Sequence, residues 1–313
     1  MAKHPNVFGA LTYHTFSRAI LRPFGTKADE QMETDDLWVF EAIGERGTAL
    51  TGYPCVSVYH HFRYHPKEVI TGVFDDWLFD HKGIFAFTVE LWDLAVAAGV
   101  EAKSKDKMFM DWFRKHPVED DVKIVAYADQ VAPGGLVPWY EFDHPQLGKV
   151  ELGGWDFLHT WRNPPHALLE AEIAPQADFA LAFAALAPRI AWREVKLTLV
   201  GEDAYHLLAV VENTGFLPTH GSSQAKKMKA VRPVRLEVAL PEGATLGGGK
   251  QKQEIGQLEG RSNKLEVASF SDSPTDNRGK AEWLIRAPQG GTLTLSAIAE
   301  RGGTIRRQIE LSR

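Results

Sequence analysis

The chain has 313 residues, of which 44% are hydrophobic, and this is enough to fill the cores of two ordinary domains. Its 35 basic and 41 acidic residues are mixed along the sequence and give a formal net charge of −6. No large basic surface is therefore predicted, which excludes nucleic acid and anionic membrane as expected partners. The longest apolar stretch, residues 179–188, is too short to span a bilayer, so no membrane segment is predicted.

The chain contains a single cysteine, Cys55. An internal disulfide is therefore impossible. A single thiol fits a reducing compartment such as the cytoplasm, although it leaves the compartment undecided.

The first half of the chain alternates apolar runs with helical stretches, which is typical of an α/β domain. The run VFGALTYH predicts a buried strand, and GIFAFTVEL predicts a second one, followed by a helical turn. One helix is expected to end at Gly47, and another is expected in one or two pieces around Pro175. These elements cover residues 7–14 and 83–91 for the strands, and 35–47 and 165–187 for the helices.

The second half reads almost entirely as short strands separated by Gly, Pro, Asn or Asp, so a domain boundary is predicted near residue 190. The predicted domains are therefore residues 1–190 and 191–313. Seven strands of this kind predict a β-sandwich of immunoglobulin-like type, and the polar stretch 221–233 predicts a long loop. The strands are expected at 192–201, 205–213, 234–241, 264–270, 281–288, 291–300 and 303–311.

Two residues at strand ends are candidates for chemistry. His14 ends the first strand, where α/β folds usually present functional groups, although a hydrogen-bonded core histidine is an alternative interpretation. Glu90 ends the apolar run FAFTVEL, where a carboxylate has to be paired, bound to a metal or solvated by a pocket. A buried carboxylate with a raised pKa is also a common general base near neutral pH.

Residues 5–190 resemble the second half of the catalytic domain of carboxypeptidase A-like zinc metallocarboxypeptidases. The resemblance rests on His14 followed by LRPFG at 21–25, and on a block without gaps that runs from Asp75-Asp76-Trp77 to Phe87-Thr88-Val89-Glu90-Leu91. The segment 144–165 resembles an extension of large bacterial members, in which a β-sandwich follows the catalytic domain. The implied fold is a mixed-sheet α/β half-domain followed by the sandwich.

The resemblance implies hydrolysis of the C-terminal peptide bond of a peptide substrate. His14 would be a zinc ligand, and Glu90 would be the catalytic base that takes a proton from water. Tyr64, or alternatively Tyr59, would be a substrate-binding tyrosine on a mobile loop. Asp75 would lie at the base of the pocket for the C-terminal side chain, which predicts a preference for Lys or Arg.

The other expected zinc ligands, an HxxE pair, and the substrate-binding arginines lie upstream of the ligand histidine in this family. Only thirteen residues precede His14 here. The string His65-Pro66-Lys67-Glu68 has the HxxE pattern, but it follows His14, and exposed loop residues are the preferred interpretation. Asp156 and His159 are similarly interpreted as turn or packing residues.

We therefore expect an incomplete zinc site and no high-affinity zinc binding by this chain alone. The missing half would come from a longer parent enzyme or from another chain, and a homo-oligomer is a further possibility. The alternative function is a non-catalytic binding or interaction module with a degenerate peptidase pocket.

Overall fold

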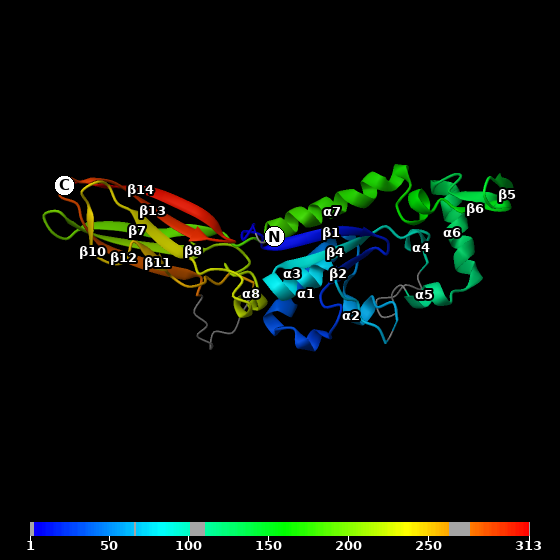
Figure 1. Ribbon diagram of the computed structural model, residues 1–313, viewed down its shortest axis with the longest axis horizontal. Helices are drawn as coiled ribbons and strands as arrows, with labels where there is room; N and C mark the ends of the chain where they lie inside the picture. Colours follow the sequence, from blue (N-terminus) through cyan, green and yellow to red (C-terminus); the bar gives the residue numbers. More distant parts are fainter. Residues whose placement is uncertain (1–2, 66, 101–109, 263–275, 313) are drawn as a thin grey trace. The chain divides into compact units, whose positions relative to one another are not determined.

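The computed structural model describes residues 3–65, 67–100, 110–262 and 276–312. Its fold is mixed α/β with several sheets, and most of the helices and strands are labelled in Figure 1. The chain forms two compact units. Unit 1 contains the described residues of Met1–Ala10, Leu78–Phe85 and Ala184–Arg313, and unit 2 contains the described residues of Leu11–Trp77 and Ala86–Phe183.

A four-stranded sheet in the order β1-β4-β2-β3 organises the first half of the chain. Strand β2 pairs with β3 in parallel and with β4 in antiparallel orientation. The predicted strands at 7–14 and 83–91 are confirmed as β1 and β4, whereas β2 and β3 were not predicted. The four strands are β1 (Gly9–Thr15), β2 (Ala19–Arg22), β3 (Cys55–Ser57) and β4 (Phe85–Leu91).

The alternation of side chains along each strand gives this sheet two different faces. On one face, Phe87 of β4 contacts the rings of Phe40 in α1 and of Phe179 in α7. Thr88 and Glu90, which alternate with Phe87 and Val89, line a cavity on the other face. Helices α1 (Thr34–Thr51) and α7 (Leu169–Ala184) thus cover one face and leave the other for the cavity.

Helix α1 confirms the predicted helix at 35–47, but the predicted end at Gly47 is wrong. The helix continues to Thr51, and Gly52 ends it in the left-handed conformation at φ 74°. The two internal glycines allow close packing instead. A Cβ at Gly47 would lie 2.7 Å from Cδ1 of Ile20, and one at Gly44 would lie 2.8 Å from Cβ of Cys55.

Helix α7 is one continuous helix, so of the two predicted forms the single piece is correct. Pro175 lies inside it, and the short 3-10 helix η3 (His166–Leu168) precedes it. Phe179 and Phe183 stack with their ring centroids 6.3 Å apart and bury their rings against the sheet. Burial of these rings offsets the hydrogen bond that Pro175 cannot donate.

The remaining elements of the first half lie between residues 29 and 161. The predicted helical turn after β4 is confirmed as α4. The hairpin β5–β6 was not predicted. These elements are η1 (Asp29–Gln31), α2 (Val58–His61), α3 (Phe74–Lys82), α4 (Leu94–Ala97), α5 (Met110–Arg114), α6 (Val118–Val131), β5 (Leu136–His144), β6 (Gly148–Trp155) and the π-helix η2 (Phe157–Trp161).

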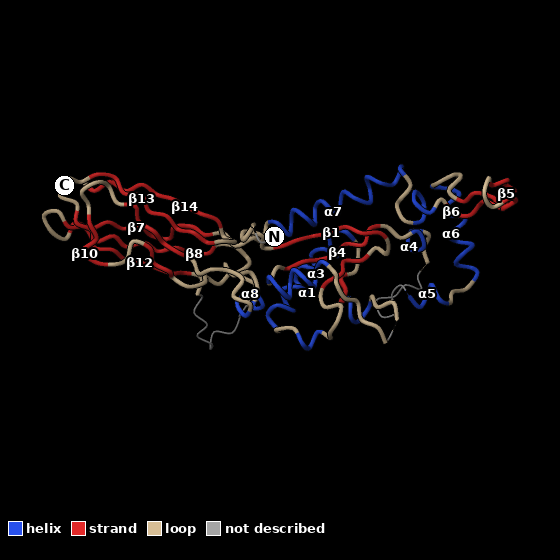
Figure 2. Tube along the Cα trace, viewed as in Figure 1, coloured by secondary structure: helices blue, strands red, loops and turns tan. Residues whose placement is uncertain are grey.

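Two four-stranded antiparallel sheets, β10-β12-β8-β7 and β11-β9-β13-β14, make up most of unit 1 (Figure 2). Every second residue of β8, from Tyr205 to Asn213, is buried. Apart from Asn213, these side chains join one hydrophobic core with residues of the other sheet, including Leu236, Leu295 and Ala297. The strands are β7 (Ile190–Leu199), β8 (Ala204–Asn213), β9 (Arg235–Ala239), β10 (Thr245–Gly248), β11 (Lys252–Glu254), β12 (Arg278–Arg286), β13 (Gly291–Ala299) and β14 (Gly303–Leu311).

Six of the seven predicted C-terminal strands are confirmed, and the predicted strand at 264–270 lies outside the described residues. The predicted long loop at 221–233 contains the short helix α8 (Ser223–Lys227), so that prediction is wrong in part. The side chain of Ser222 caps α8 by accepting a hydrogen bond from the nitrogen of Ala225 at 3.0 Å. Within the described residues, no helix combines the length and apolar character needed to cross a bilayer.

The close contact between α1 and β3 gives a test of the fold. Gly44→Ala raises helix propensity by about 1 kcal/mol, but its Cβ would overlap the Cys55 side chain. We expect the free energy of unfolding to fall by roughly 1–2 kcal/mol, because overpacking outweighs propensity. Arg46→Ala, on the exposed side of α1, is the control and should change it by less than about 0.5 kcal/mol in urea titrations. A stabilised Gly44→Ala protein would contradict this packing.

Candidate active site

A single cavity of about 380 Å³ brings together the four residues proposed from the sequence. It is lined by His14, Tyr64, Asp75 and Glu90, and the rest of its wall is mainly apolar. His14 and Glu90 come from neighbouring strands, Asp75 lies in the first turn of α3, and Tyr64 follows α2. The other lining residues are Leu21, Val58, Phe62, Ile70, Gly72, Val73, Phe74 and Thr88.

Glu90 is a buried carboxylate with little compensation. Only 8% of the residue is exposed, and Oε1 lies 3.9 Å from Nδ1 of His14. Burial raises the pKa of Glu90 to about 7, and the positive charge of Arg162 opposes this rise. At neutral pH the carboxyl group can therefore both accept and return a proton, as a general base requires.

His14 has a different environment from Glu90. Its side chain is 57% exposed, so the alternative interpretation as a core histidine is wrong. The preceding residue, Tyr13, points its hydroxyl group to the carbonyl oxygen of Gln176 in α7 at 3.5 Å. Strand alternation consequently directs His14 to the cavity face, beside Glu90.

Asp75 is the second buried carboxylate of the cavity. It is 1% exposed, and its Oδ2 has no hydrogen-bond partner among the described residues. Burial, followed by the neighbouring charge of Asp76, raises the pKa of Asp75 to about 7. A buried acceptor that is left unsatisfied at a cavity wall is a natural place for a donor group of a ligand.

Asp76 has a structural task that the sequence motif did not reveal. Both of its carboxylate oxygens accept a hydrogen bond from the nitrogen of Gly25, at 3.1 and 2.9 Å. A Cβ at Gly25 would lie 2.6 Å from the carbonyl oxygen of Ile70, so this position needs glycine. The LRPFG turn and the start of α3 are thereby tied together, although 51 residues separate them.

Tyr64, and not Tyr59, lines the cavity. The carbonyl oxygen of Tyr64 accepts a hydrogen bond from Nη2 of Arg114 at 2.6 Å. Tyr59 instead packs under the guanidinium group of Arg63, whose Cζ lies 4.4 Å from the ring centroid. Of the two candidates for the loop tyrosine, the geometry favours Tyr64.

Arg162 is a residue of this site that the sequence interpretation missed. It follows the π-helix η2 and donates hydrogen bonds to Oγ1 and the carbonyl oxygen of Thr15, which directly follows His14. Its guanidinium group lies 5.6 Å from the ring centroid of Phe16. Since 147 residues separate Arg162 from Thr15, no local pattern could have indicated this contact.

The other sequence candidates lie apart from this group. His65, Lys67 and Glu68 are exposed, and Pro66 of the HxxE string lies outside the described residues. His159 and Asp156 form an exposed pair with 3.3 Å between Nδ1 and Oδ2, in which Asp156 also caps η2. Both observations agree with the interpretation of these residues as loop and turn residues.

The cavity residues do not fit a complete zinc site. Within the described parts of the chain, no group of three His, Cys, Asp or Glu side chains is placed to hold a metal ion. His14 and Glu90 are the donors that approach each other at the cavity, and a protein zinc site needs three or four. Any metal here would need donors beyond these residues.

One family model matches the C-terminal part of the chain. Residues 189–310, fewer than half of the chain, match a family described as Domain of unknown function (DUF8731). A comparison with curated proteins finds no match.

Three solved structures are similar over about two fifths of the chain. They are the D00-D0 domain of Intimin (11% identity, TM-score 0.19, 41% of this chain and 49% of that chain), the β-glucosidase DesR from Streptomyces venezuelae in complex with D-glucose (7%, 0.19, 40% and 15%) and superoxide reductase in the oxidised state (15%, 0.18, 40% and 87%). The match spans about half of the Intimin chain and a smaller part of DesR. With these TM-scores, the similarities define neither fold nor function.

The raised pKa of Asp75 predicts how stability depends on pH. Between pH 4 and 7 the folded protein keeps a proton that the unfolded chain has released, so the free energy of unfolding falls as pH rises through this window. Asn cannot titrate, so Asp75→Asn removes this dependence on pH. The free energy of unfolding of the variant minus that of wild type should therefore rise by on the order of a few kcal/mol from pH 4 to pH 8.

Urea unfolding at several pH values measures this difference. Thr88→Val, another change in the cavity wall, is the matched control. It introduces no change in titration, so its effect on stability should be the same at each pH. An Asp75→Asn difference that is also constant with pH would show that Asp75 titrates normally.

Proposed function

We propose that this chain carries the general base and part of the substrate pocket of a zinc carboxypeptidase. In this proposal residues 1–190 are the second half of the mixed-sheet catalytic domain, and the two sheets of residues 191–313 form an immunoglobulin-like sandwich. The observation that carries the proposal is the meeting of His14, Tyr64, Asp75 and Glu90 at one cavity. Residues far apart in the sequence meet there in the combination that the family resemblance implies.

Glu90 is the residue proposed to move protons. Its carboxylate would take a proton from a water molecule while the water oxygen forms a bond to the scissile carbonyl carbon. It would then pass this proton to the nitrogen of the leaving amino acid as the C–N bond breaks. A pKa of about 7 supports both transfers, because the donor and acceptor forms are then similarly populated at neutral pH.

Asp75 is proposed to select the C-terminal side chain of the peptide. Its buried, unsatisfied Oδ2 would accept a hydrogen bond from a guanidinium or ammonium group. Such a cation would also favour the ionised form of Asp75 and offset the cost of its burial. The proposed substrates are therefore peptides that end in Arg or Lys.

The zinc ion belongs to the proposal through the resemblance, with His14 as the one candidate ligand on the cavity face. We propose that its other ligands and the substrate-binding arginines are supplied by an N-terminal catalytic half, either in a longer parent enzyme or on another chain. A homo-oligomer is a further form in which the site could be completed.

A non-catalytic binding module is the second candidate function. It is favoured by the cavity wall, in which Leu21, Val58 and Phe62 are among several apolar residues around a few polar groups. Small-molecule and peptide pockets often have this composition. Both functions include peptide binding, but only the first includes hydrolysis that depends on Glu90.

Peptide binding to this chain tests the role of Asp75. Two peptides that differ only in ending with Arg or Phe are titrated by calorimetry at pH 8, where Asp75 is mostly ionised. We expect the Arg peptide to bind about tenfold more tightly, a difference of roughly 1.4 kcal/mol, and Asp75→Asn to remove it. Tighter binding of the Phe peptide, or an unchanged preference in Asp75→Asn, would contradict the proposed selectivity.

Hydrolysis distinguishes the two functions. In an assembly that supplies the missing donors, release of C-terminal Arg is followed by mass spectrometry. Glu90→Gln should lower release by at least about a hundredfold while peptide binding persists. The exposed Glu141→Gln is the control. Equal release by Glu90→Gln would rule out Glu90 as the base.

A further inference from the structure

The turn between α3 and β4 connects the two site carboxylates along the chain. Asp75 lies at the start of α3, Glu90 lies at the end of β4, and Gly83 is in the turn between them. Gly83 has φ 53°, and a Cβ there would overlap the backbone nitrogen of Ala225. The turn therefore depends on glycine for both its conformation and its close approach to α8.

Three side chains from the C-terminal part of the chain bind the carbonyl groups at the end of α3. Arg301 donates from Nη1 to Gly83 at 3.0 Å and from Nη2 to Lys82 at 2.7 Å. Ser222 donates from Oγ to the same carbonyl of Gly83, and Gln224 donates from Nε2 to that of Asp80, both at 2.8 Å. Residues 78–85 belong to the same compact unit as these donors. The last carbonyls of a helix lack partners within the helix, so these side chains act as its C-cap.

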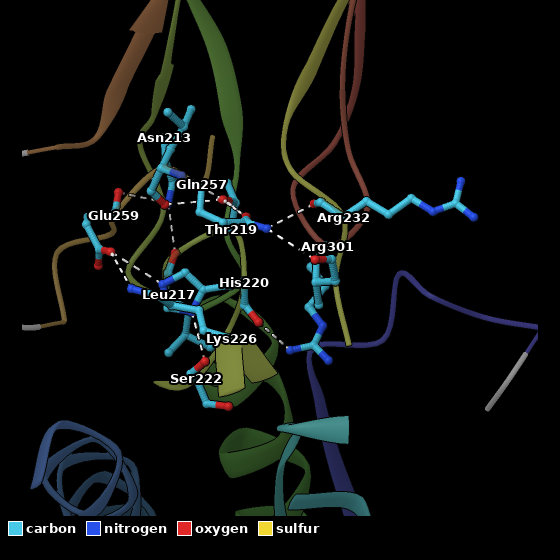
Figure 3. Close-up of polar contacts among 12 residues, drawn as sticks. Asn213, Leu217, Thr219, His220, Ser222, Lys226, Arg232, Gln257, Glu259 and Arg301 are labelled. Carbon is cyan, nitrogen blue, oxygen red and sulfur yellow. Dashed lines mark hydrogen bonds and ion pairs between the residues drawn. The ribbon is translucent and has the colours of Figure 1, made fainter. Parts of the chain in front are cut away.

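Arg301 caps the C-terminus of α3 from a buried position, because only 6% of the residue is exposed. Its guanidinium group donates hydrogen bonds to three carbonyl oxygens, the third being that of His220 at 2.6 Å (Figure 3). Burial lowers the pKa of Arg301 to about 10, which reflects the cost of placing the charge there. The partial negative charge of a helix C-terminus offsets part of this cost.

The loop that carries these donors is itself held in place. Asn213 is fully buried at the end of β8, and its Nδ2 donates to the carbonyl oxygens of Leu217 at 2.9 Å and Glu259 at 3.2 Å (Figure 3). Oγ1 of Thr219 donates to Oε1 of Gln257 at 2.7 Å. The donors to the α3–β4 turn thus rest on the framework of the two sheets.

We propose that the C-terminal part of the chain, residues 184–313, holds the α3–β4 turn in place through Arg301. Arg301 is thereby a positioning residue for Asp75 and Glu90. Residues 189–310, which match the domain of unknown function, would then have the role of holding this turn. The catalytic roles of Asp75 and Glu90 rest on the function proposed above, but the effect of Arg301 on the α3–β4 turn does not depend on them. A loosened turn would let the start of β4 and the end of α3 open more often and would hydrate the cavity wall.

Hydrogen–deuterium exchange of the whole chain tests this link. In Arg301→Gln, amides of residues 78–90 should exchange at least about tenfold faster, and Arg301→Lys, which keeps the charge, should restore part of the protection. Arg307→Gln, exposed on β14, is the control and should change exchange less than twofold. Unchanged exchange at 78–90 in folded Arg301→Gln would overturn the proposal.

A second readout separates positioning from general stability. The pKa of Asp75, followed by carbon NMR, should fall in Arg301→Gln from about 7 toward its ordinary value and recover partly in Arg301→Lys. If Arg301→Gln does not fold, Gln224→Ala decides, because it weakens the same cap at Asp80. Local exchange that is unchanged there would again overturn the link. Loss of peptide selectivity without any change in exchange would count against this inference alone.

Discussion

The burial of a carboxylate at the end of β4 is the constraint on which the rest of this structure depends. An ionised group inside a protein loses hydration energy that only partners can return, and Glu90 has few of them. His14 lies 3.9 Å away, and Arg162 acts on it through its charge. The fold keeps this group at a cavity wall, where stability alone would favour an apolar residue. Such a conflict between local stability and placement is typical of functional sites.

A second network fixes the chain just beyond Glu90. Glu172 of α7 accepts hydrogen bonds from the backbone nitrogen of Trp92 at 3.1 Å and from Nη2 of Arg18 at 3.1 Å, as well as from the hydroxyl group of Tyr53. Burial raises the pKa of Tyr53, so this hydroxyl remains a donor. Trp92 has φ 60°, and its side chain donates from Nε1 to the carbonyl oxygen of Thr160 at 3.0 Å. The exit of β4 is therefore held by several partners.

The two ends of β4 are thus fixed by different parts of the chain. At its start, Arg301 and Ser222 donate hydrogen bonds to the carbonyl oxygen of Gly83. At its end, Glu172 accepts a hydrogen bond from the backbone nitrogen of Trp92. Between them, strand alternation alone decides that Phe87 faces the helices and Glu90 faces the cavity. A short strand fixed at both ends can hold a charged side chain in an orientation that burial opposes.

Local sequence patterns predicted the strands that have strong apolar character, such as β1, β4, β8 and β13, because their period follows directly from burial on one side. They did not predict β2 or β3, which are only four and three residues long. The end of α1 was also predicted wrongly, at Gly47, because the sequence pattern does not show why a glycine is there. A glycine that allows contact with Ile20 and Phe179 looks, in the sequence, like a helix stop.

The candidate site was predictable to the extent that its residues lie at strand ends or in the block from Asp75 to Glu90. The link between Asp76 and Gly25, the contact of Arg162 with Thr15, and the cap by Arg301 were not predictable. Each of them joins residues at least 51 positions apart through one side chain, and only the folded backbone brings these groups together.

The most direct measurement is the pKa of Glu90 itself. Carbon NMR of the protein with labelled glutamate, assigned by the loss of one signal in Glu90→Gln, follows this carboxyl group through a pH titration. A midpoint of about 7 is the result that this account of a buried general base predicts. A midpoint near 4.5, the ordinary value for glutamate, would show a well-solvated carboxylate and contradict it.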